Sequence, residues 1–230
     1  MMQYDLHLHS CLSPCANDDM TPATIAGMAK LAGADLIAIT DHNSALNLPA
    51  AAKACAAYGL KLLPGIEVNT AEEIHVLCYF KTVADALCFG ETLYAALPAF
   101  PYDPVIWGKQ LVMDENDVVL SPVEKLLTGA VSLDIYAVKA ACEALGGIAV
   151  PAHVEKDSSS LLSVLGFLSD DLPFTAFELK NPQKLDDLIR RGLLPAGREI
   201  LTSSDAHQLE DIAADLHTLR TDSVLNTLLY

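Results

Sequence analysis

Two histidines near the start of the chain have the spacing of neighbouring metal ligands. His7 and His9 lie in the apolar run Tyr4–Ser10. Side chains alternate faces in an extended strand, so the two imidazoles point one way while Leu6 and Leu8 point the other. Neutral imidazole is the commonest protein ligand for divalent transition metals. The pair therefore predicts half of a metal site; on these residues alone, an edge strand with two solvated histidines is the alternative.

Further candidate ligands stand at the ends of other apolar runs. They are Thr40-Asp41-His42, Gly65-Ile66-Glu67, His75, Pro151-Ala152-His153 and Ser204-Asp205-Ala206-His207. The carboxyl ends of parallel strands share one face of an α/β domain, and sites assemble there. Six histidines, Glu67, Asp205 and an acid from Asn17-Asp18-Asp19 would converge on that face, which predicts a polynuclear metal centre. The seventh histidine, His217, lies in a polar stretch and is expected to be structural or exposed.

Short apolar runs alternate with helical segments along the chain. The predicted strands are Tyr4–His9, Leu36–Thr40, Leu62–Val68, Ile74–Phe80, Ile148–His153, Ala176–Leu179 and Ile200–Ser204. The predicted helices are Pro22–Ala32, Leu48–Tyr58, Ala84–Leu97, Leu133–Leu145, Ser159–Leu168 and Lys184–Arg191. Continuous apolar runs are typical of parallel strands buried on both faces. This order predicts a single α/β domain over residues 1–230 with a parallel sheet, open or closed into a barrel.

Residues 98–131 interrupt this alternation. The segment contains several prolines, the only tryptophan, and two short β-like runs around the acidic turn Asp114–Asp117. We interpret it as an insertion, either a cap over the mouth of the site or a packing excursion away from it.

Composition restricts the class of protein. The chain has 230 residues, of which 52% are hydrophobic, so a sizeable core is expected. Its formal net charge of −16 repels phosphate backbones, so stable nucleic-acid binding is not expected. A small phosphorylated substrate remains compatible, because bound divalent cations reverse the local field. No apolar run reaches the ~18 residues that span a bilayer, so no membrane partner is expected.

The six cysteines show no disulfide framework. The chain enters a predicted strand directly after Met-Met-Gln, so we expect no signal peptide and a cytoplasmic protein with reduced thiols. Cys11 and Cys15 lie beside the histidine pair and could form a soft-metal site. Their spacing is not that of a usual zinc knuckle, and the hard ligands nearby suffice, so this is the weaker interpretation.

The ordered set of motifs resembles the PHP (polymerase and histidinol phosphatase) superfamily of metal-dependent phosphoesterases. The matching elements run through the chain in family order: His7-x-His9, Thr40-Asp41-His42, Gly65-x-Glu67 with His75, Pro151-Ala-His153 and Ser204-Asp205-Ala-His207. The resemblance implies a distorted (β/α)7 TIM-like barrel with two or three divalent ions at its carboxyl-terminal mouth.

The resemblance also implies a ligand set. His7, His9, Glu67 and Asp205 would hold the first ion; Glu67, His75 and His153 the second; Asp18, His42 and His207 the third. Family members usually carry Ser-Asp-Gly where this chain has Asn17-Asp18-Asp19, so Asp19 is an alternative to Asp18. Asp41 would either orient His42 or simply occupy a turn.

These ligands suit zinc, manganese or iron better than calcium. Ions bridged by Glu67 would favour in-line displacement at phosphorus, and either Asp205 or His207 could protonate the leaving group. The predicted function is therefore hydrolysis of a small phosphomonoester or nucleotide, with Glu67, Asp205 and His207 as catalytic residues. Lys156 is the first candidate for phosphate contact and Lys180 the second.

Two alternatives remain open on the sequence. An amidohydrolase-type metal hydrolase would use a similar His-x-His pair to attack a carbon centre, on a C–N or C–O bond. A metal-holding regulatory or structural module is the other, although such a module would tolerate the loss of some ligands. The oligomeric state does not follow from the sequence.

Overall fold

The computed structural model describes residues 2–100, 102–214 and 216–230, and the strands within them form four small sheets. The largest sheet contains, in spatial order, β11 (His217–Thr218), β1 (Gln3–Leu8), β2 (Leu36–Ile39) and β3 (Lys61–Leu62). The second contains β4 (Gly65–Asn69), β5 (His75–Tyr79) and β8 (Ile148–Pro151). The others are the pairs β9 (Ala176–Glu178) with β10 (Glu199–Leu201), and β6 (Leu111–Met113) with β7 (Val119–Pro122).

The long helices lie where the sequence predicts them. The helices are α1 (Pro22–Ala32), α2 (Leu48–Tyr58), α3 (Val83–Ala96), α4 (Pro104–Trp107), α5 (Ile135–Ala144), α6 (Leu161–Leu165), α7 (Leu185–Arg190) and α8 (Asn226–Leu229). Two short 3-10 turns, η1 (Pro182–Lys184) and η2 (Leu209–Asp211), accompany them. The Thr21 side chain caps α1 by accepting a hydrogen bond from the Thr24 N–H at 3.1 Å. Gly33 and Gly59 end α1 and α2 in the left-handed conformation, which glycine adopts without a steric penalty.

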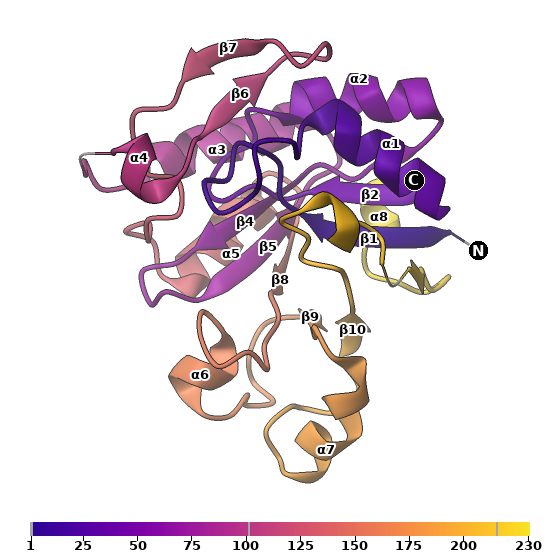
Figure 1. The fold of residues 1–230 in the computed structure, drawn as a ribbon. Coiled ribbons are helices and arrows are strands. Elements are labelled where there is room, and N and C mark those ends of the chain that lie inside the picture. The colour runs from indigo at the N-terminus through magenta and orange to yellow at the C-terminus, as the bar shows by residue number, and fades with distance from the viewer. Residues whose placement is uncertain (1, 101, 215) are drawn as a thin grey trace.

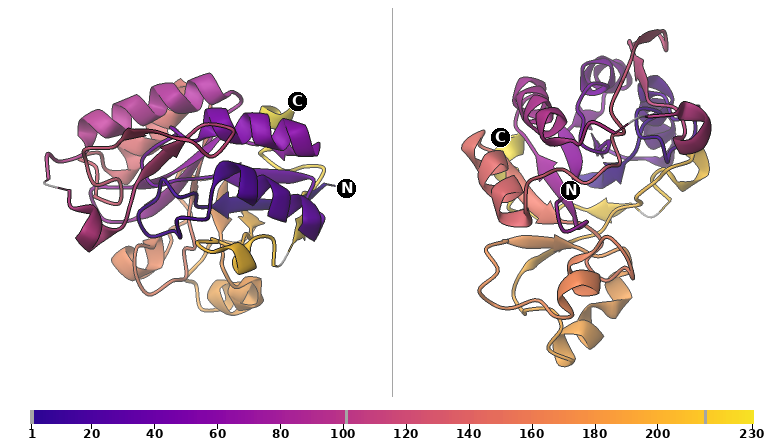
Figure 2. Two further views of the ribbon diagram at one scale, coloured as in Figure 1. Left: turned by 45° about the horizontal axis from the view of Figure 1, so that its top comes forward. Right: turned by 90° about the vertical axis from the view of Figure 1, so that its left-hand side faces the viewer.

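Helices α1, α2 and α3 lie along one side of the central strands, on the upper side of Figure 1. The segment from α6 to β10, coloured orange, forms a lower lobe in Figure 1 and in the right-hand view of Figure 2. Strand β1 lies between β11 and β2, and His7 and His9 are fully buried. The histidine pair therefore does not lie on a solvated edge strand.

The prediction that all core strands are parallel is wrong for the second sheet. Strands β1, β2 and β3 are parallel, as are β9 and β10, but β5 runs antiparallel to both β4 and β8. In this register Asn69 lies opposite His75, and Val76 lies opposite Pro151. The amino end of β5 thus lies at the same edge as the carboxyl ends of β4 and β8. His75 reaches the site because its strand is reversed.

The predicted strand Leu62–Val68 is two strands. Pro64 separates β3 from β4, because proline fixes φ and offers no N–H to a ladder. The ladders between described strands do not close into a ring; isolated parallel bridges at Leu8–Ala206 and His42–Glu67 link the sheets instead. The mixed α/β class is confirmed, whereas the distorted (β/α)7 barrel stays a prediction.

The insertion 98–131 contains α4 and the hairpin β6–β7, whose strands flank the acidic turn as predicted. The hairpin lies against α2 (Figure 1), where the Asn47 side chain accepts from the Met113 N–H at 2.9 Å. Lys53 on α2 pairs with Glu115 at 2.8 Å. A capping role for this segment stays a prediction.

Gly147→Ala is expected to destabilise the protein by about 1–3 kcal/mol, through overpacking at the start of β8. A Cβ at this position would lie 2.6 Å from Cys142 Sγ and 2.8 Å from the Tyr79 carbonyl oxygen, which is fixed in β5. Gly27→Ala is the matched control: its Cβ would meet only the Tyr58 side chain, at 3.4 Å, and alanine favours the helix by about 0.5–1 kcal/mol. Urea unfolding measures both variants; equal stabilities would contradict this account of β8.

Candidate metal centre

Strand β1 brings the two imidazoles of His7 and His9 together, with their Nε2 atoms 3.2 Å apart. The other ring nitrogen of each is engaged. His7 Nδ1 donates to the Glu178 carboxylate at 3.0 Å, and His9 Nδ1 donates to Ser13 Oγ at 3.1 Å. These partners place the proton on Nδ1 and leave both Nε2 lone pairs facing inward, as a metal ligand requires.

Glu67 on β4 is the centre of the cluster. Its side chain is 1% exposed, and imidazole nitrogens of five histidines lie 3.0–3.3 Å from its carboxylate oxygens. These histidines are His7, His9, His42, His75 and His153. The five come from β1, the loop after β2, the start of β5 and the loop after β8, so distant segments meet at one carboxylate.

The loop after β10 adds Asp205 and His207. Asp205 Oδ1 lies 3.3 Å from His7 Nε2 and 3.5 Å from His9 Nε2. The His207 ring stacks on the His9 ring with centroids 4.2 Å apart. Asp205 has φ 51 and His153 has φ 29, left-handed conformations that are uncommon for non-glycine residues and cluster at functional sites. Six of the seven histidines therefore gather here, while His217 lies on β11, paired with β1.

Two buried carboxylates hold the imidazoles in place. Glu178, at the end of β9, bonds His7 and also accepts from the His153 N–H at 3.0 Å. Glu178 was not among the residues predicted from the sequence. The available signal was a lone acid within a predicted buried strand, because a buried charge requires a partner. Asp41 accepts from the Ser13 hydroxyl at 2.7 Å, and Ser13 in turn bonds His9. Asp41 thus supports His9 through Ser13.

The electrostatics give Glu67, His42 and His207 the protonation states that metal binding requires. Burial alone would raise the pKa of Glu67, but the imidazoles of His75 and His7 outweigh it and hold the pKa well below its ordinary value. Burial lowers the pKa of His42 well below its ordinary value and that of His207 to about 4. Glu67 is therefore ionised and these two rings are neutral at pH 7, the forms that bind metal.

The residues present fit a cluster of divalent ions. Buried Nδ1 atoms of His42, His75 and His153 have no hydrogen-bond partner in the structure. Two ligands on one ion, each about 2.0–2.1 Å from it, lie about 2.8–3.4 Å apart in octahedral or tetrahedral geometry. The nitrogen–oxygen separations of 3.0–3.3 Å around Glu67 match these edges.

Asp18 does not join the cluster. Its side chain is 55% exposed and pairs with Lys109 of the insertion, and among the described residues no imidazole lies within ion-pair distance of it. The alternative residue, Asp19, is exposed as well. The carboxylate that the resemblance implies beside His42 and His207 is thus absent from the described arrangement, because the loop after β1 turns both acids outward. The same loop places Cys15 beside these histidines instead.

The two lysines lie in different cavities. Lys156 pairs with Asp205 and lines a cavity of 190 Å³ together with Glu67, His153 and His207. Lys180 donates to the Ser204 carbonyl and lines a polar cleft of 760 Å³. Asp205 lies in both linings, so it forms part of the wall between the metal cluster and the cleft.

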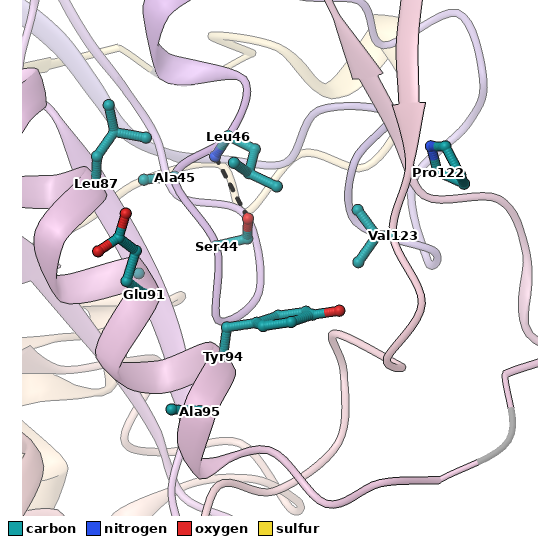
Figure 3. A pocket seen from close by; sticks show the side chains of 10 residues that line it. Ser44, Ala45, Leu46, Leu87, Glu91, Tyr94, Ala95, Pro122 and Val123 are labelled. Carbon is teal, nitrogen blue, oxygen red and sulfur yellow. Dashed lines mark hydrogen bonds between the residues drawn. The ribbon is translucent and has the colours of Figure 1, made fainter.

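A separate apolar cavity of 390 Å³ lies between α3, the loop Ser44–Leu46 and the end of β7 (Figure 3). Tyr94 and Glu91 of α3 line it, and its lining contains no histidine. It is therefore distinct from the imidazole cluster, although Ser44 follows His42 by only two residues.

Among the described residues, no helix has the length and apolar character needed to cross a bilayer.

Comparison with known proteins finds a matching family model and one similar sequence segment. The family model of the PHP domain matches residues 5–163. A 74-residue segment is 36% identical to the 5'-3' exoribonuclease Rnm of Salmonella typhimurium, and it makes up 31% of this chain and 24% of that protein.

Solved structures that share the fold include an endonuclease and a putative phosphoesterase. The lesion-specific endonuclease PfuEndoQ of Pyrococcus furiosus superposes with a TM-score of 0.63 and 21% identity, over 91% of this chain and 49% of that chain. A putative metal-dependent phosphoesterase of Bifidobacterium adolescentis gives a TM-score of 0.60 and 20% identity, over 89% of this chain and 87% of that chain. The chain thus spans about a quarter of the exoribonuclease and about half of the endonuclease.

Proposed function

This chain belongs to the PHP domain family. We propose that it is a metal-dependent hydrolase of phosphoester bonds and that its substrate is a small phosphomonoester or nucleotide. The observation that carries this proposal is the buried Glu67 carboxylate in contact with five imidazoles, beside a cavity that contains a lysine. We assign His7, His9, Glu67 and Asp205 to a first ion, Glu67, His75 and His153 to a second, and His42 and His207 to a third. Zinc, manganese and iron suit this donor set.

Bound divalent ions supply Lewis-acid stabilisation of charge on the phosphoryl oxygens and a hydroxide nucleophile at neutral pH. Among the described residues lining the 190 Å³ cavity, Lys156 is the only lysine or arginine. Its ammonium group neutralises Asp205 and is placed to hold a phosphoryl oxygen as a point charge. His207 Nδ1 lies 2.9 Å from the Asp205 carbonyl, which places the ring proton on Nδ1 and leaves the Nε2 lone pair free to bind the third ion.

The adjoining polar cleft favours a substrate with a leaving group larger than phosphate. The cleft shares Asp205 with the metal cluster, and Lys180, Asn181 and Gln183 line it with polar groups. A nucleoside or sugar could occupy this cleft while its phosphate lies over the imidazole cluster. The net charge of −16 disfavours long polynucleotides, so we propose that short substrates are preferred.

The test is phosphate release from a panel of mononucleotides, sugar phosphates and short oligonucleotides, with lactones and amides as the carbon-centre arm. We expect release from at least one mononucleotide or sugar phosphate, and loss of release after chelation or in His9→Ala. The exposed variant Cys88→Ser is the control and should retain full activity. Turnover of lactones or amides alone would show an amidohydrolase-type enzyme, and preferred cleavage of oligonucleotides would overturn the small-substrate proposal.

The affinity for divalent ions is expected to rise with pH between about 6.5 and about 9. In the metal-free protein, burial lowers the pKa of His9, but hydrogen bonds with Asp205 and Glu67 outweigh it and raise the pKa to about 9. The proton on His9 stabilises the metal-free fold fully below about pH 6.5, and this stabilisation is lost as the pH rises through about 9. Metal must displace that proton, and the carboxylates of Glu178, Asp205 and Glu67 outweigh burial and raise the pKa of His7 as well, so affinity should rise at least about tenfold per pH unit in this window.

Competition with a chelator at several pH values measures this rise. Calorimetry in two buffers of different ionisation enthalpy counts the protons released. A pH-independent affinity would contradict the assignment of His9 as a ligand that is protonated in the metal-free state.

A further inference from the structure

Cys15 lies beside the third group of candidate ligands. Its loop joins β1 to α1, and its Sγ lies within 4.8 Å of ligand nitrogens of His9, His42 and His207. Two contacts fix this loop against the cluster. The Ser13 hydroxyl donates to Asp41 at 2.7 Å, and the Asn17 N–H donates to the His207 carbonyl at 2.9 Å. The sulfur is therefore held close to the two imidazoles.

The imidazole groups around Cys15 independently indicate a ligand. His42 is 5% exposed, and its buried Nδ1 makes no hydrogen bond, although Glu67 Oε2 lies 3.3 Å from it. His207 uses Nδ1 on the Asp205 carbonyl and leaves Nε2 uncommitted. The acid that could complete this group, Asp18, is paired with Lys109 instead. Two imidazoles and a thiol thus remain where a third ion would need three protein ligands.

We propose that Cys15, with His42 and His207, forms a thiolate-containing site for the third metal ion. The inference rests on the metal centre of the proposed function. Binding breaks the S–H bond, releases the proton to solvent and forms a sulfur–metal bond. One thiolate and two imidazoles make a soft donor set with an open fourth position, which is typical of catalytic zinc sites and selects zinc over manganese or magnesium.

Cobalt(II) is the probe, because thiolate ligation gives a near-ultraviolet charge-transfer band that imidazole and carboxylate ligands do not give. The full chain is stripped by chelation, reloaded with cobalt(II) and assayed for the band and for ions bound per chain. We expect Cys15→Ser to lose the band and one ion. Cys15→Asp should regain the ion without the band. Asp18→Asn and the exposed control Cys88→Ser should keep both.

A measurement on the unaltered chain covers the case in which a Cys15 variant does not fold. Cys15 and Cys88 are both exposed in the metal-free structure, so both should react with iodoacetamide at alkaline pH. Cys15 should react more slowly than Cys88, because partial burial and the charge of Glu67 raise the pKa of its thiol to about 12. Zinc should protect Cys15 and leave Cys88 reactive, as peptide mass mapping would show.

Three results would overturn the inference: a charge-transfer band that survives in Cys15→Ser, loss of an ion in Asp18→Asn, or equal alkylation of Cys15 with and without zinc. None of these readouts requires a substrate. A chain that shows the band but releases no phosphate would refute the proposed function and support the Cys15 site. A chain that releases phosphate but shows no band would support the proposed function and refute the Cys15 site.

Discussion

Glu67→Gln is expected to reduce phosphoester hydrolysis by at least roughly 1000-fold and to lower the number of ions bound. Removing a single group that stabilises transition-state charge commonly costs 10²–10³-fold, and Glu67 faces five imidazoles at once. Glutamine preserves the side-chain volume, so the loss reflects the missing negative charge and not a cavity. The amide nitrogen of glutamine would also face imidazole nitrogens. Once these nitrogens bind metal, they have no lone pair left to accept a hydrogen bond from the amide.

Initial rates at saturating substrate and elemental analysis of the purified variant measure the two effects. Glu115→Gln is the matched control, because Glu115 pairs with Lys53 on the surface, where such pairs contribute little. If the Glu67→Gln variant retained its bound ions and its rate, Glu67 would not be a metal ligand.

Glu178→Gln is expected to weaken metal binding by roughly 10- to 100-fold, although Glu178 faces no ion in our assignment. Its carboxylate holds the His7 ring through Nδ1 and the His153 backbone through its N–H, at 3.0 Å each. Both bonds end on Oε2, and Oε1 lies 3.2 Å from the same His7 nitrogen. Glutamine removes the charge and one of the two oxygens that face His7, so the His7 imidazole becomes a weaker ligand.

Titration of the stripped protein with zinc against a competing chelator gives the affinity. The rate at limiting zinc should fall by the same factor and recover in excess zinc, which distinguishes a positioning role from direct participation in the reaction. Glu210→Gln, at an exposed position, should change neither quantity. A rate that stays low in excess zinc would assign Glu178 a direct role in catalysis.

Most elements of the fold could be predicted because their boundaries are local. Pro22, Gly33 and Gly59 mark helix ends through their own backbone preferences, and α1 and α2 begin and end as predicted. Strand direction is not local. An apolar run buried on both faces has the same composition whether its neighbour is parallel or antiparallel, so the reversal of β5 was not visible in the sequence.

The imidazole cluster was more predictable than the residues around it. Histidines at strand ends are conspicuous because few other structural roles place them there. Glu178 was not predicted as a site residue because the segment that contains it has the apolar composition of an ordinary buried strand, apart from this one charge. The conformation of the loop after β1 decides that Cys15, and not Asp18, lies beside His42 and His207. Asp18 pairs with Lys109, and no local sequence pattern indicates such a long-range contact.

The bridge between Leu8 and Ala206 has a consequence for how the protein is made. A ribosome adds roughly 5–20 residues per second, so roughly 10–40 s separate the synthesis of His9 from that of Asp205. During that interval the nascent chain displays imidazoles without the acid that completes the first ion site. The proposed first site can therefore form only after Asp205 has been synthesised, and a chain truncated before Asp205 lacks one of its ligands.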